Sequence, residues 1–131
     1  KEVGVAMVEI GASTTDLAAY YEGKVQHVAI LPFGGNTLTA DLVRGLSVPY
    51  AEAQKAKEHY GTAFAQLVDP RETVEMPGPS PGQKRAVARE LIAHIIEQRL
   101  DEMLTESFGF GAVTWKGFRC PAFECFTAIS R

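Results

Sequence analysis

The feature that most constrains the fold of this chain is a short turn of small residues between two apolar runs. Residues 3–10 are mostly apolar and β-branched and end at Gly11, which predicts a buried strand followed by a turn. Residues 11–16 read Gly-Ala-Ser-Thr-Thr-Asp, and a second apolar run follows at residues 17–21. The spacing therefore predicts two strands joined by a tight turn.

Such a turn can bind an anion, because successive backbone N–H groups at a tight bend point toward one place. Thr14 and Thr15 add hydroxyl donors. Glu9 and Asp16 flank the turn and could hold a hydrated divalent cation, which prefers carboxylate oxygens and retained waters. An ordinary β-hairpin turn has a similar composition, so the residues alone leave both interpretations open.

A third strand is predicted after a short loop around Glu22 and Gly23. Residues 25–31 alternate loosely between apolar and polar, as a sheet strand with unequal faces does. His27 lies in this strand and is interpreted as a partly exposed strand residue rather than a catalytic base, because no nucleophile is near it in sequence. Residues 1–35 are therefore predicted to form three strands.

Two glycines, Gly34 and Gly35, separate this strand from a predicted helix. Asn36 or Thr37 can cap that helix by accepting backbone N–H bonds. Glycine before a helix N-terminus lets a ligand approach the backbone donors and the positive end of the helix dipole. A plain strand-to-helix connection is the alternative. The apolar stripe of this helix is predicted at Leu38, Leu42, Val43 and Leu46.

Two more helices are predicted. Pro49 fits the first turn of one helix, and Gly61 fits its C′ position. The other helix covers about residues 84–104. Its predicted apolar side holds Ala88, Leu91, Ile92, Ile95, Ile96 and Met103, and its predicted polar side holds Glu90, His94, Glu97 and Asp101.

Arg99 lies inside that apolar stripe, where a guanidinium is costly unless a carboxylate pairs with it or it reaches water along its stem. One interpretation is an internal salt bridge or such an extended side chain. The other is a contact that accepts an anionic partner, with Arg85 and Arg89 adding positive charge near the helix start.

The remaining segments are marked by proline, aromatic residues and cysteine. Residues 68–76 predict a strand with a turn, and residues 76–82 predict a loop because they hold three prolines and two glycines. Residues 105–131 hold five of the seven Phe residues and the only Trp. This tail is either an added strand pair that completes the core or a segment without an evolved role. Cys120 and Cys125 make neither a four-ligand zinc site nor a disulfide framework.

Composition excludes several classes of function. The 131 residues amount to one small domain and begin at Lys1 rather than Met, which predicts a piece of a longer protein. A formal net charge of −3 argues against a general nucleic-acid surface, which needs an excess of basic residues. No apolar run approaches the roughly 20 residues of a membrane span, and no signal peptide is present.

Several motifs in order resemble the actin-like ATPases, and most closely the FtsA family of bacterial cell-division proteins. The second phosphate loop of that family typically reads V-D-I-G-G-G-T-T-D, and residues 8–16 here read V-E-I-G-A-S-T-T-D. The resemblance continues through residues 30–42 (ILPFGGNTLTADL), 49–61 (PYAEAQKAKEHYG) and 85–104 (RAVARELIAHIIEQRLDEML), and stops there.

The resemblance implies an α/β (α+β) fold that is part of an actin-like, RNase H-like ATPase domain. Residues 1–35 would be the strand core with the phosphate loop, residues 36–104 a small helical subdomain, and residues 105–131 an atypical tail. ATP with Mg²⁺ is implied in the full-length context, with Mg²⁺ held through water by Glu9 and Asp16. The implied nucleotide-binding residues are Gly11, Ala12, Ser13, Thr14, Thr15, Gly34, Gly35, Asn36, Gln54 and Lys57.

Three positions of the phosphate loop and one position of the second helix depart from the family pattern. Ala12 and Ser13 stand where glycines permit closer backbone approach, and Glu9 replaces Asp. In the family, a Glu and a Lys three positions apart on the second helix contact the adenosine. Gln54 and Lys57 are assigned to these positions, so Gln54 also departs, although an amide can still bond to a ribose hydroxyl.

The family resemblance also implies the partners. Such proteins polymerise into actin-like filaments and tether the FtsZ ring to the inner face of the cell membrane at the division site. Their membrane anchor is a C-terminal amphipathic helix that is not among these residues. Their small helical subdomain binds the acidic, partly apolar C-terminal peptide of FtsZ, which assigns that contact to Arg85, Arg89 and Arg99. The isolated chain is not expected to hydrolyse ATP, and no residue is assigned as catalytic.

Three alternatives remain. A PilM-like actin relative of type IV pilus assembly is suggested because G-A-S-T-T resembles the loop of that group, although residues 49–104 argue against it. A metabolic kinase or chaperone ATPase could share the loop, but would need a substrate base or a coupled peptide-binding domain. An inactive, truncated fragment is the third alternative.

Overall fold

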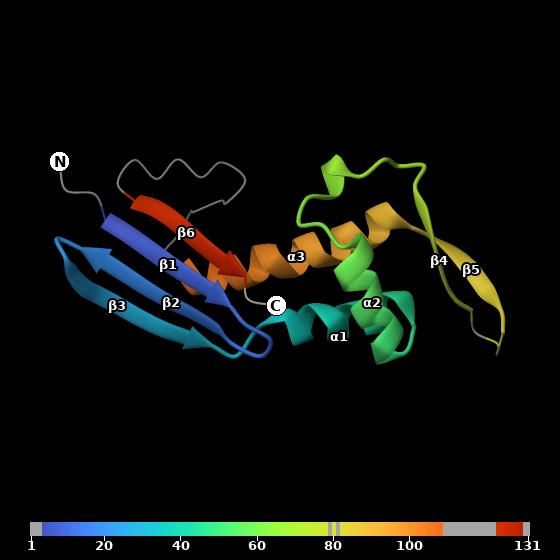
Figure 1. Ribbon diagram of the computed structural model, residues 1–131, viewed down its shortest axis with the longest axis horizontal. Coiled ribbons are helices and arrows are strands. Elements are labelled where there is room, and N and C mark those ends of the chain that lie inside the picture. Colours follow the sequence, from blue (N-terminus) through green and yellow to red (C-terminus); the bar gives the residue numbers. More distant parts are fainter. Residues whose placement is uncertain (1–3, 79, 81, 109–122, 130–131) are drawn as a thin grey trace. The chain divides into compact units, whose positions relative to one another are not determined.

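The computed structural model describes residues 4–78, 80, 82–108 and 123–129 (Figure 1). The chain divides into two compact units. The first unit contains residues 1–36 and 103–131, and the second contains residues 37–102. Within the described residues, no helix is long and apolar enough to cross a membrane.

The first unit is built on a four-stranded sheet in the order β3-β2-β1-β6 (Figure 1). Strands β1 (Gly4–Ile10), β2 (Thr15–Tyr21) and β3 (Lys24–Leu31) pair antiparallel, which confirms the three predicted strands. The β2–β3 turn has positive φ angles at Glu22 (52°) and Gly23 (71°), as a two-residue hairpin turn requires.

Strand β6 (Phe123–Ile129) pairs parallel with β1 along its whole length. Within the described residues, the predicted tail therefore contributes one strand to the sheet rather than the pair of strands considered above. Residues 109–122, with Cys120, lie outside the described part of the chain, and so do the side chains of β6. Whether the tail completes the core stays a prediction.

The two faces of this sheet differ in burial. On one face, Val8 and Leu17 are buried with Met103 of α3 (Arg89–Phe108), and Ala29 and Phe33 pack beside them. Residues paired across antiparallel strands share a face. The register therefore gathers six exposed apolar side chains of the three N-terminal strands on the other face, in cross-strand rows: Val5, Tyr20 and Val25, then Met7 and Val28, then Ile30.

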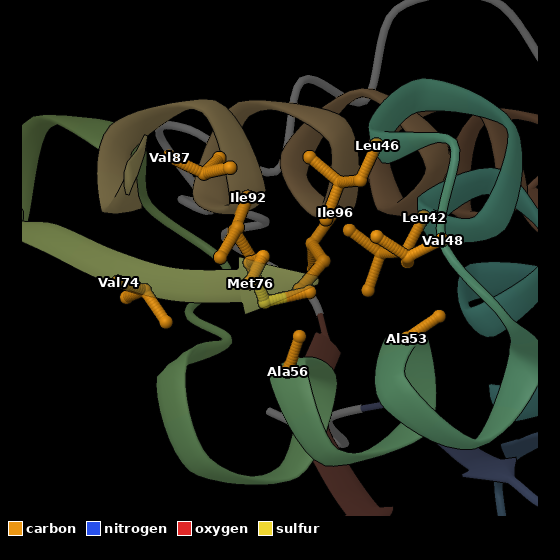
Figure 2. Packing of buried hydrophobic residues seen from close by; sticks show 10 residues of the cluster. All are labelled: Leu42, Leu46, Val48, Ala53, Ala56, Val74, Met76, Val87, Ile92 and Ile96. Atoms are coloured by element: carbon orange, nitrogen blue, oxygen red, sulfur yellow. The ribbon is translucent and has the colours of Figure 1, made fainter. Parts of the chain in front are cut away.

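The second unit has helices around one apolar core, with a two-stranded hairpin. Its elements are α1 (Gly35–Leu46, which begins in the first unit), α2 (Tyr50–Tyr60), the short 3₁₀ helix η1 (Ala65–Leu67), β4 (Thr73–Pro77), β5 (Lys84–Ala88) and the greater part of α3. Figure 2 shows the core residues, which come from α1, the α1–α2 connection, α2, the hairpin and α3: Leu42, Leu46, Val48, Ala53, Ala56, Val74, Met76, Val87, Ile92 and Ile96.

The stripe predicted for α1 is confirmed, because Leu42 and Leu46 lie in this core and Leu38 and Val43 pack against it. The predicted cap is wrong by two residues or more. The helix begins at Gly35, so Asn36 and Thr37 lie inside its first turn.

The predicted helix over residues 84–104 is wrong at its first turn. Residues 84–88 form β5, which pairs antiparallel with β4 and places Val87 opposite Val74. Both valines are buried in the core, so tertiary pairing overrides a local pattern that continues the helical period. Arg85 therefore lies on a strand, and α3 runs from Arg89 to Phe108. The predicted loop before it joins β4 to β5, and β4 forms only the end of the strand predicted over residues 68–76.

Two residues of α3 lie on the opposite side from the one predicted. Leu91 is 45% exposed, whereas Glu97 is only 5% exposed and accepts a bond from the Ala65 backbone N–H at 3.4 Å. The cause is the segment around η1, which covers this side of the helix through contacts of Ala65 and Val68 with Ala93. Helical periodicity identifies an apolar stripe but not a second segment that packs beside it.

Gly61 ends α2 for a different reason than the predicted one. Its φ of −65° is not left-handed, so it does not have the C′ conformation that favours glycine. A Cβ at this position would lie 2.3 Å from the Lys57 carbonyl oxygen and 2.9 Å from Ile96 Cδ1. Close packing therefore requires glycine here.

Candidate functional site

The predicted phosphate turn lies at the end of the β1–β2 hairpin. Ile10 and Thr15 form the last cross-strand pair, and the Gly11 N–H donates to the Thr14 carbonyl at 2.8 Å. Residues 11–14 are thus a tight four-residue turn within the first unit. Ser13 and Thr14 are exposed at its tip.

The start of α1 is hydrogen-bonded to this turn. The Gly35 N–H donates to the Gly11 carbonyl at 2.9 Å, and the Asn36 N–H donates to the Ala12 carbonyl at 2.8 Å. The Asn36 side-chain amide donates to Ser13 Oγ at 3.2 Å. Two carbonyls of the turn therefore accept hydrogen bonds from the start of the helix, which fixes the conformation of the turn.

This arrangement changes which backbone donors can meet a ligand. The N–H groups of Gly35 and Asn36 are bonded to the turn, so they hold it in place. Among the described residues, the N–H groups of Ala12, Ser13 and Thr14 have no backbone acceptor. Three successive N–H groups at a bend form the kind of concavity that binds an anion.

Gly34 is required by its close approach to this turn. A Cβ there would lie 2.5 Å from the Gly11 oxygen and 2.6 Å from the Ala12 oxygen, both backbone atoms that cannot yield easily. The structure thus gives Gly34 a packing role, as the plain-connection interpretation of the glycine pair expects. Its assigned contact with nucleotide stays a prediction.

The two threonines of the turn differ. Thr15 is buried, and its hydroxyl donates to the Phe33 carbonyl at 2.8 Å. A nucleotide contact by Thr15 would have to break this bond. Thr14 is exposed, so its hydroxyl is the better placed of the two donors that the sequence predicts.

Glu9 and Asp16 form a cross-strand pair next to the turn, and both are exposed. Like charges placed directly opposite each other on a sheet repel, and a hydrated divalent cation would relieve that repulsion. The described residues contain no group of three or more His, Cys, Asp or Glu side chains that could hold a metal. The assignment of this pair to an ion held through water stays a prediction.

In the second unit, Gln54 lies on α2, and both the oxygen and the nitrogen of its side-chain amide are hydrogen-bonded. Thr39 Oγ1 donates to Gln54 Oε1 at 2.7 Å, and Gln54 Nε2 donates to Glu58 Oε1 at 2.5 Å. Burial lowers the pKa of Lys57, and the charge of Glu58 opposes that shift. A ribose hydroxyl would meet a Gln54 amide that already has intrachain partners.

A second pair of candidate nucleoside-binding residues on α2 was not predicted from the sequence. Glu52 and Lys55 are also three positions apart, and Lys55 Nζ lies 2.9 Å from Glu52 Oε1. They match the family's Glu and Lys without the departure that Gln54 requires. The signal was present as Glu-x-x-Lys inside the quoted motif, two positions before the assigned pair.

The arginines assigned to a partner each have contacts within the second unit. Arg85 on β5 donates to the Leu46 carbonyl near the end of α1. Arg89 donates to both carboxylate oxygens of Glu72 at 2.9 Å and to the Tyr60 carbonyl at 3.1 Å. Arg85 does not share a helical face with Arg89 and Arg99, because it lies on β5, before α3 begins at Arg89.

Arg99 makes the internal salt bridge that was one of its two interpretations. Its Nε donates to Asp41 Oδ2 at 2.5 Å and its Nη2 to Asp41 Oδ1 at 3.0 Å, and its Nη1 donates to Glu102 Oε2 at 2.6 Å. These bonds explain how a guanidinium is tolerated in the apolar stripe. They do not test whether a partner also reaches it.

One surface feature of α3 was not predicted. Leu91 lines an open hollow of about 270 Å³ with Ala88, Glu90 and His94.

The fold defines the class of protein. A solved structure of Spiroplasma citri MreB5 bound to ADP aligns with a TM-score of 0.61 and 18% identity, over 82% of this chain and 35% of that one. A non-polymerising MamK variant bound to AMPPNP aligns with a TM-score of 0.62 and 15% identity, over 94% of this chain and 41% of that one. A PilM–PilN type IV pilus biogenesis complex aligns with a TM-score of 0.51 and 18% identity, over 82% of this chain and 24% of that one. The chain therefore has part of an actin-like ATPase fold.

The family is narrower than the fold. The family model described as cell division protein FtsA matches residues 6–129. The FtsA of Pseudomonas aeruginosa is 36% identical over 105 residues, and that of Escherichia coli K12 is 34% identical over 104. These alignments cover 80% and 79% of this chain and 25% of each relative. The chain belongs to the FtsA cell-division family and spans about a quarter of the length of these relatives. The family match extends to residue 129, so the predicted end of the resemblance at residue 104 is wrong.

Proposed function

We propose that this chain is the part of a division protein that binds nucleotide phosphates with its first unit and the FtsZ C-terminal peptide with its second. The observation that carries the proposal is the FtsA-type phosphate turn, in which two carbonyls are bonded to the start of α1 while, among the described residues, three successive N–H groups have no backbone acceptor. In the full-length context the ligand would be ATP. Glu9 and Asp16 would hold Mg²⁺ through water.

Two observations support a nucleotide. The MreB5 and MamK structures that share the fold are described as bound to ADP and AMPPNP. The turn of this chain supplies neutral backbone donors to an anion, which is how phosphates are commonly bound. Ala12 and Ser13 keep these donors but add side chains, so phosphate would sit farther from the turn than it does over glycines.

For the nucleoside, α2 offers Gln54 with Lys57 and Glu52 with Lys55. The second pair is favoured because it has the family residue types and Gln54 is already bonded to Thr39 and Glu58. We predict that Glu52→Gln with Lys55→Gln lowers nucleotide affinity on the order of tenfold, through the loss of hydrogen bonds to charged groups.

The matched control for this prediction is Gln54→Ala with Lys57→Gln. Both double variants would be titrated with millimolar ATP while ¹⁵N shifts of α2 are recorded. If only the Gln54 and Lys57 variant loses the ATP-induced shift changes, Gln54 and Lys57 are the residues that contact the nucleoside.

For the peptide, α3 offers a basic group and an apolar hollow on one helix. Leu91 of the hollow and Arg99 are eight residues apart, or about 12 Å along the axis. An acidic, partly apolar peptide could place an apolar side chain against Leu91 and a carboxylate near Arg99, as in groove recognition of peptides. Arg85 would then act from β5 and Arg89 from the first residue of α3.

The test is fluorescence anisotropy with a labelled FtsZ C-terminal peptide. Replacing Arg99 alone would leave Asp41 without its partner, so the variant is Arg99→Gln with Asp41→Asn. We expect peptide binding to weaken by about 1–2 kcal/mol, because a charge-assisted contact is lost. Arg71→Gln, an exposed change of the same arginine charge, is the control.

Circular dichroism must show that the double variant remains folded. A folded double variant that binds the peptide as well as the unmodified protein would remove Arg99 from the partner site. Added salt should weaken the unmodified interaction moderately, because its charged groups are partly exposed.

The wider role follows from the family rather than from these residues. We propose self-association into actin-like filaments and a position at the inner face of the membrane at the division site, through a helix outside this chain. The PilM-like alternative has the resemblance of its loop and a likeness of fold in its favour, whereas the FtsA family has sequence identity over most of the chain. Nothing in the described residues favours a metabolic kinase or a chaperone ATPase, and an inactive fragment is one outcome of these tests.

A further inference from the structure

We propose that Glu102 competes with an acidic partner for Arg99. The affinity of the second unit for that partner then depends on how easily Glu102 is displaced from Arg99. The proposal rests on the proposed function, since the partner is the acidic peptide assigned above to α3. It concerns the regulation of that contact and names a residue to which the resemblance assigns no role.

Arg99 is bonded to two carboxylates at once. Two of its nitrogens donate to Asp41 and a third donates to Glu102 at 2.6 Å. The three side chains together carry a charge of −1. A further carboxylate approaching this arginine therefore meets net repulsion instead of an available cation.

The two carboxylates differ in how firmly they are held. Asp41 makes a two-point contact with the guanidinium, and the side chains of Arg99 and Asp41 are only 24% and 16% exposed. Bidentate contact is the stronger geometry, and breaking it would leave a largely buried charge unpaired. Asp41 is therefore the permanent partner.

Glu102 makes one bond to Arg99, and its side chain is 56% exposed. Exposed ion pairs contribute little free energy, because water and salt replace them readily. A partner carboxylate can take the place of Glu102 on Nη1 while Glu102 turns into solvent. The guanidinium then keeps two carboxylates, so affinity depends on how easily Glu102 leaves.

The experiment compares the unmodified chain with Glu102→Gln and Glu22→Gln, by anisotropy with the labelled FtsZ C-terminal peptide. Glu22 is exposed in the β2–β3 turn of the first unit, and its replacement makes the same change in net charge. Glu102→Gln should bind about two- to fivefold more tightly, the scale of one exposed ion pair. Glu22→Gln should bind as the unmodified chain does. The gain should shrink as salt is added.

Equal or weaker binding by Glu102→Gln, when the unmodified chain binds, would overturn the competition and leave the proposed peptide site standing. Failure of every variant to bind would remove the peptide site and the competition together. Binding by Glu102→Gln alone would show that Glu102 blocks the arginine completely. Thermal melts by circular dichroism accompany each variant, and Glu102→Ala provides a second replacement if Glu102→Gln is unstable.

Discussion

At the scale of single residues, the turn at residues 11–14 depends on atoms that are distant in sequence. Sequence patterns identified the turn because small and hydroxyl residues follow a buried strand. They could not show that the Thr15 hydroxyl bonds to the Phe33 carbonyl, or that Gly35 and Asn36 bond to the turn. Hydroxyl and amide groups look the same in sequence whether they bond within the protein or to a ligand.

Gly34 provides a prediction at this scale. Gly34→Ala should destabilise the chain by about 1–3 kcal/mol, because its Cβ would overlap backbone oxygens of the turn and the turn would have to shift. Urea denaturation followed by circular dichroism measures the change. Gly23→Asn is the control: position 23 has a positive φ that asparagine tolerates and no atom within 4 Å, so about 0.5 kcal/mol or less is expected. Equal stability of Gly34→Ala would mean that the turn moves freely.

At the scale of elements, strands were easier to predict than the limits of helices. The three N-terminal strands are local, since alternation and a turn at Glu22 and Gly23 specify them. The start of α3 was misplaced because residues 84–88 continue a helical period but pair with β4 instead. The burial of Glu97 was missed for a similar reason, since it depends on the segment that contains Ala65.

The β4–β5 hairpin provides a prediction about pH. Lys84 donates a hydrogen bond to Glu75 at 2.8 Å, and this bond, with the charge of Lys84, lowers the pKa of Glu75. The same bond and charge raise the pKa of Lys84. Glu75 thus supports the hairpin above its ordinary pKa of 4.5 and loses this effect as pH falls through its lowered pKa. Lys84 supports it below 10.5 and loses this effect as pH rises through its raised pKa.

Cross-strand NOEs between β4 and β5 should therefore be strongest between these values and weaken at both extremes. The carboxyl ¹³C shift of Glu75 reports its own titration directly. Lys84→Gln should move the pKa of Glu75 upward. If the Glu75 titration is the same in that variant, the ion pair does not form in solution.

At the scale of the whole chain, the order of the motifs could be predicted from sequence, whereas the place of the tail could not. Strand β6 pairs with β1 although more than a hundred residues separate them in sequence. No local periodicity reports such a pairing, and parallel strands require a long connection. The motifs at residues 8–16 and 49–61 were recognisable because each is contiguous.

The last prediction concerns nucleotide binding by the chain itself. The chain spans about a quarter of its relatives, its phosphate turn belongs to the first unit, and the candidate nucleoside residues of α2 belong to the second. Ala12 and Ser13 also add side chains where the closest phosphate approach would be made. We therefore expect no measurable ATP hydrolysis and a dissociation constant in the millimolar range, because each bound group must offset the loss of translational freedom with few contacts. Isothermal titration with and without Mg²⁺ measures this affinity, and Ala12→Gly with Ser13→Gly is the matched variant that should strengthen it. Micromolar, Mg²⁺-dependent binding by the unmodified chain would show that these residues alone form a sufficient site.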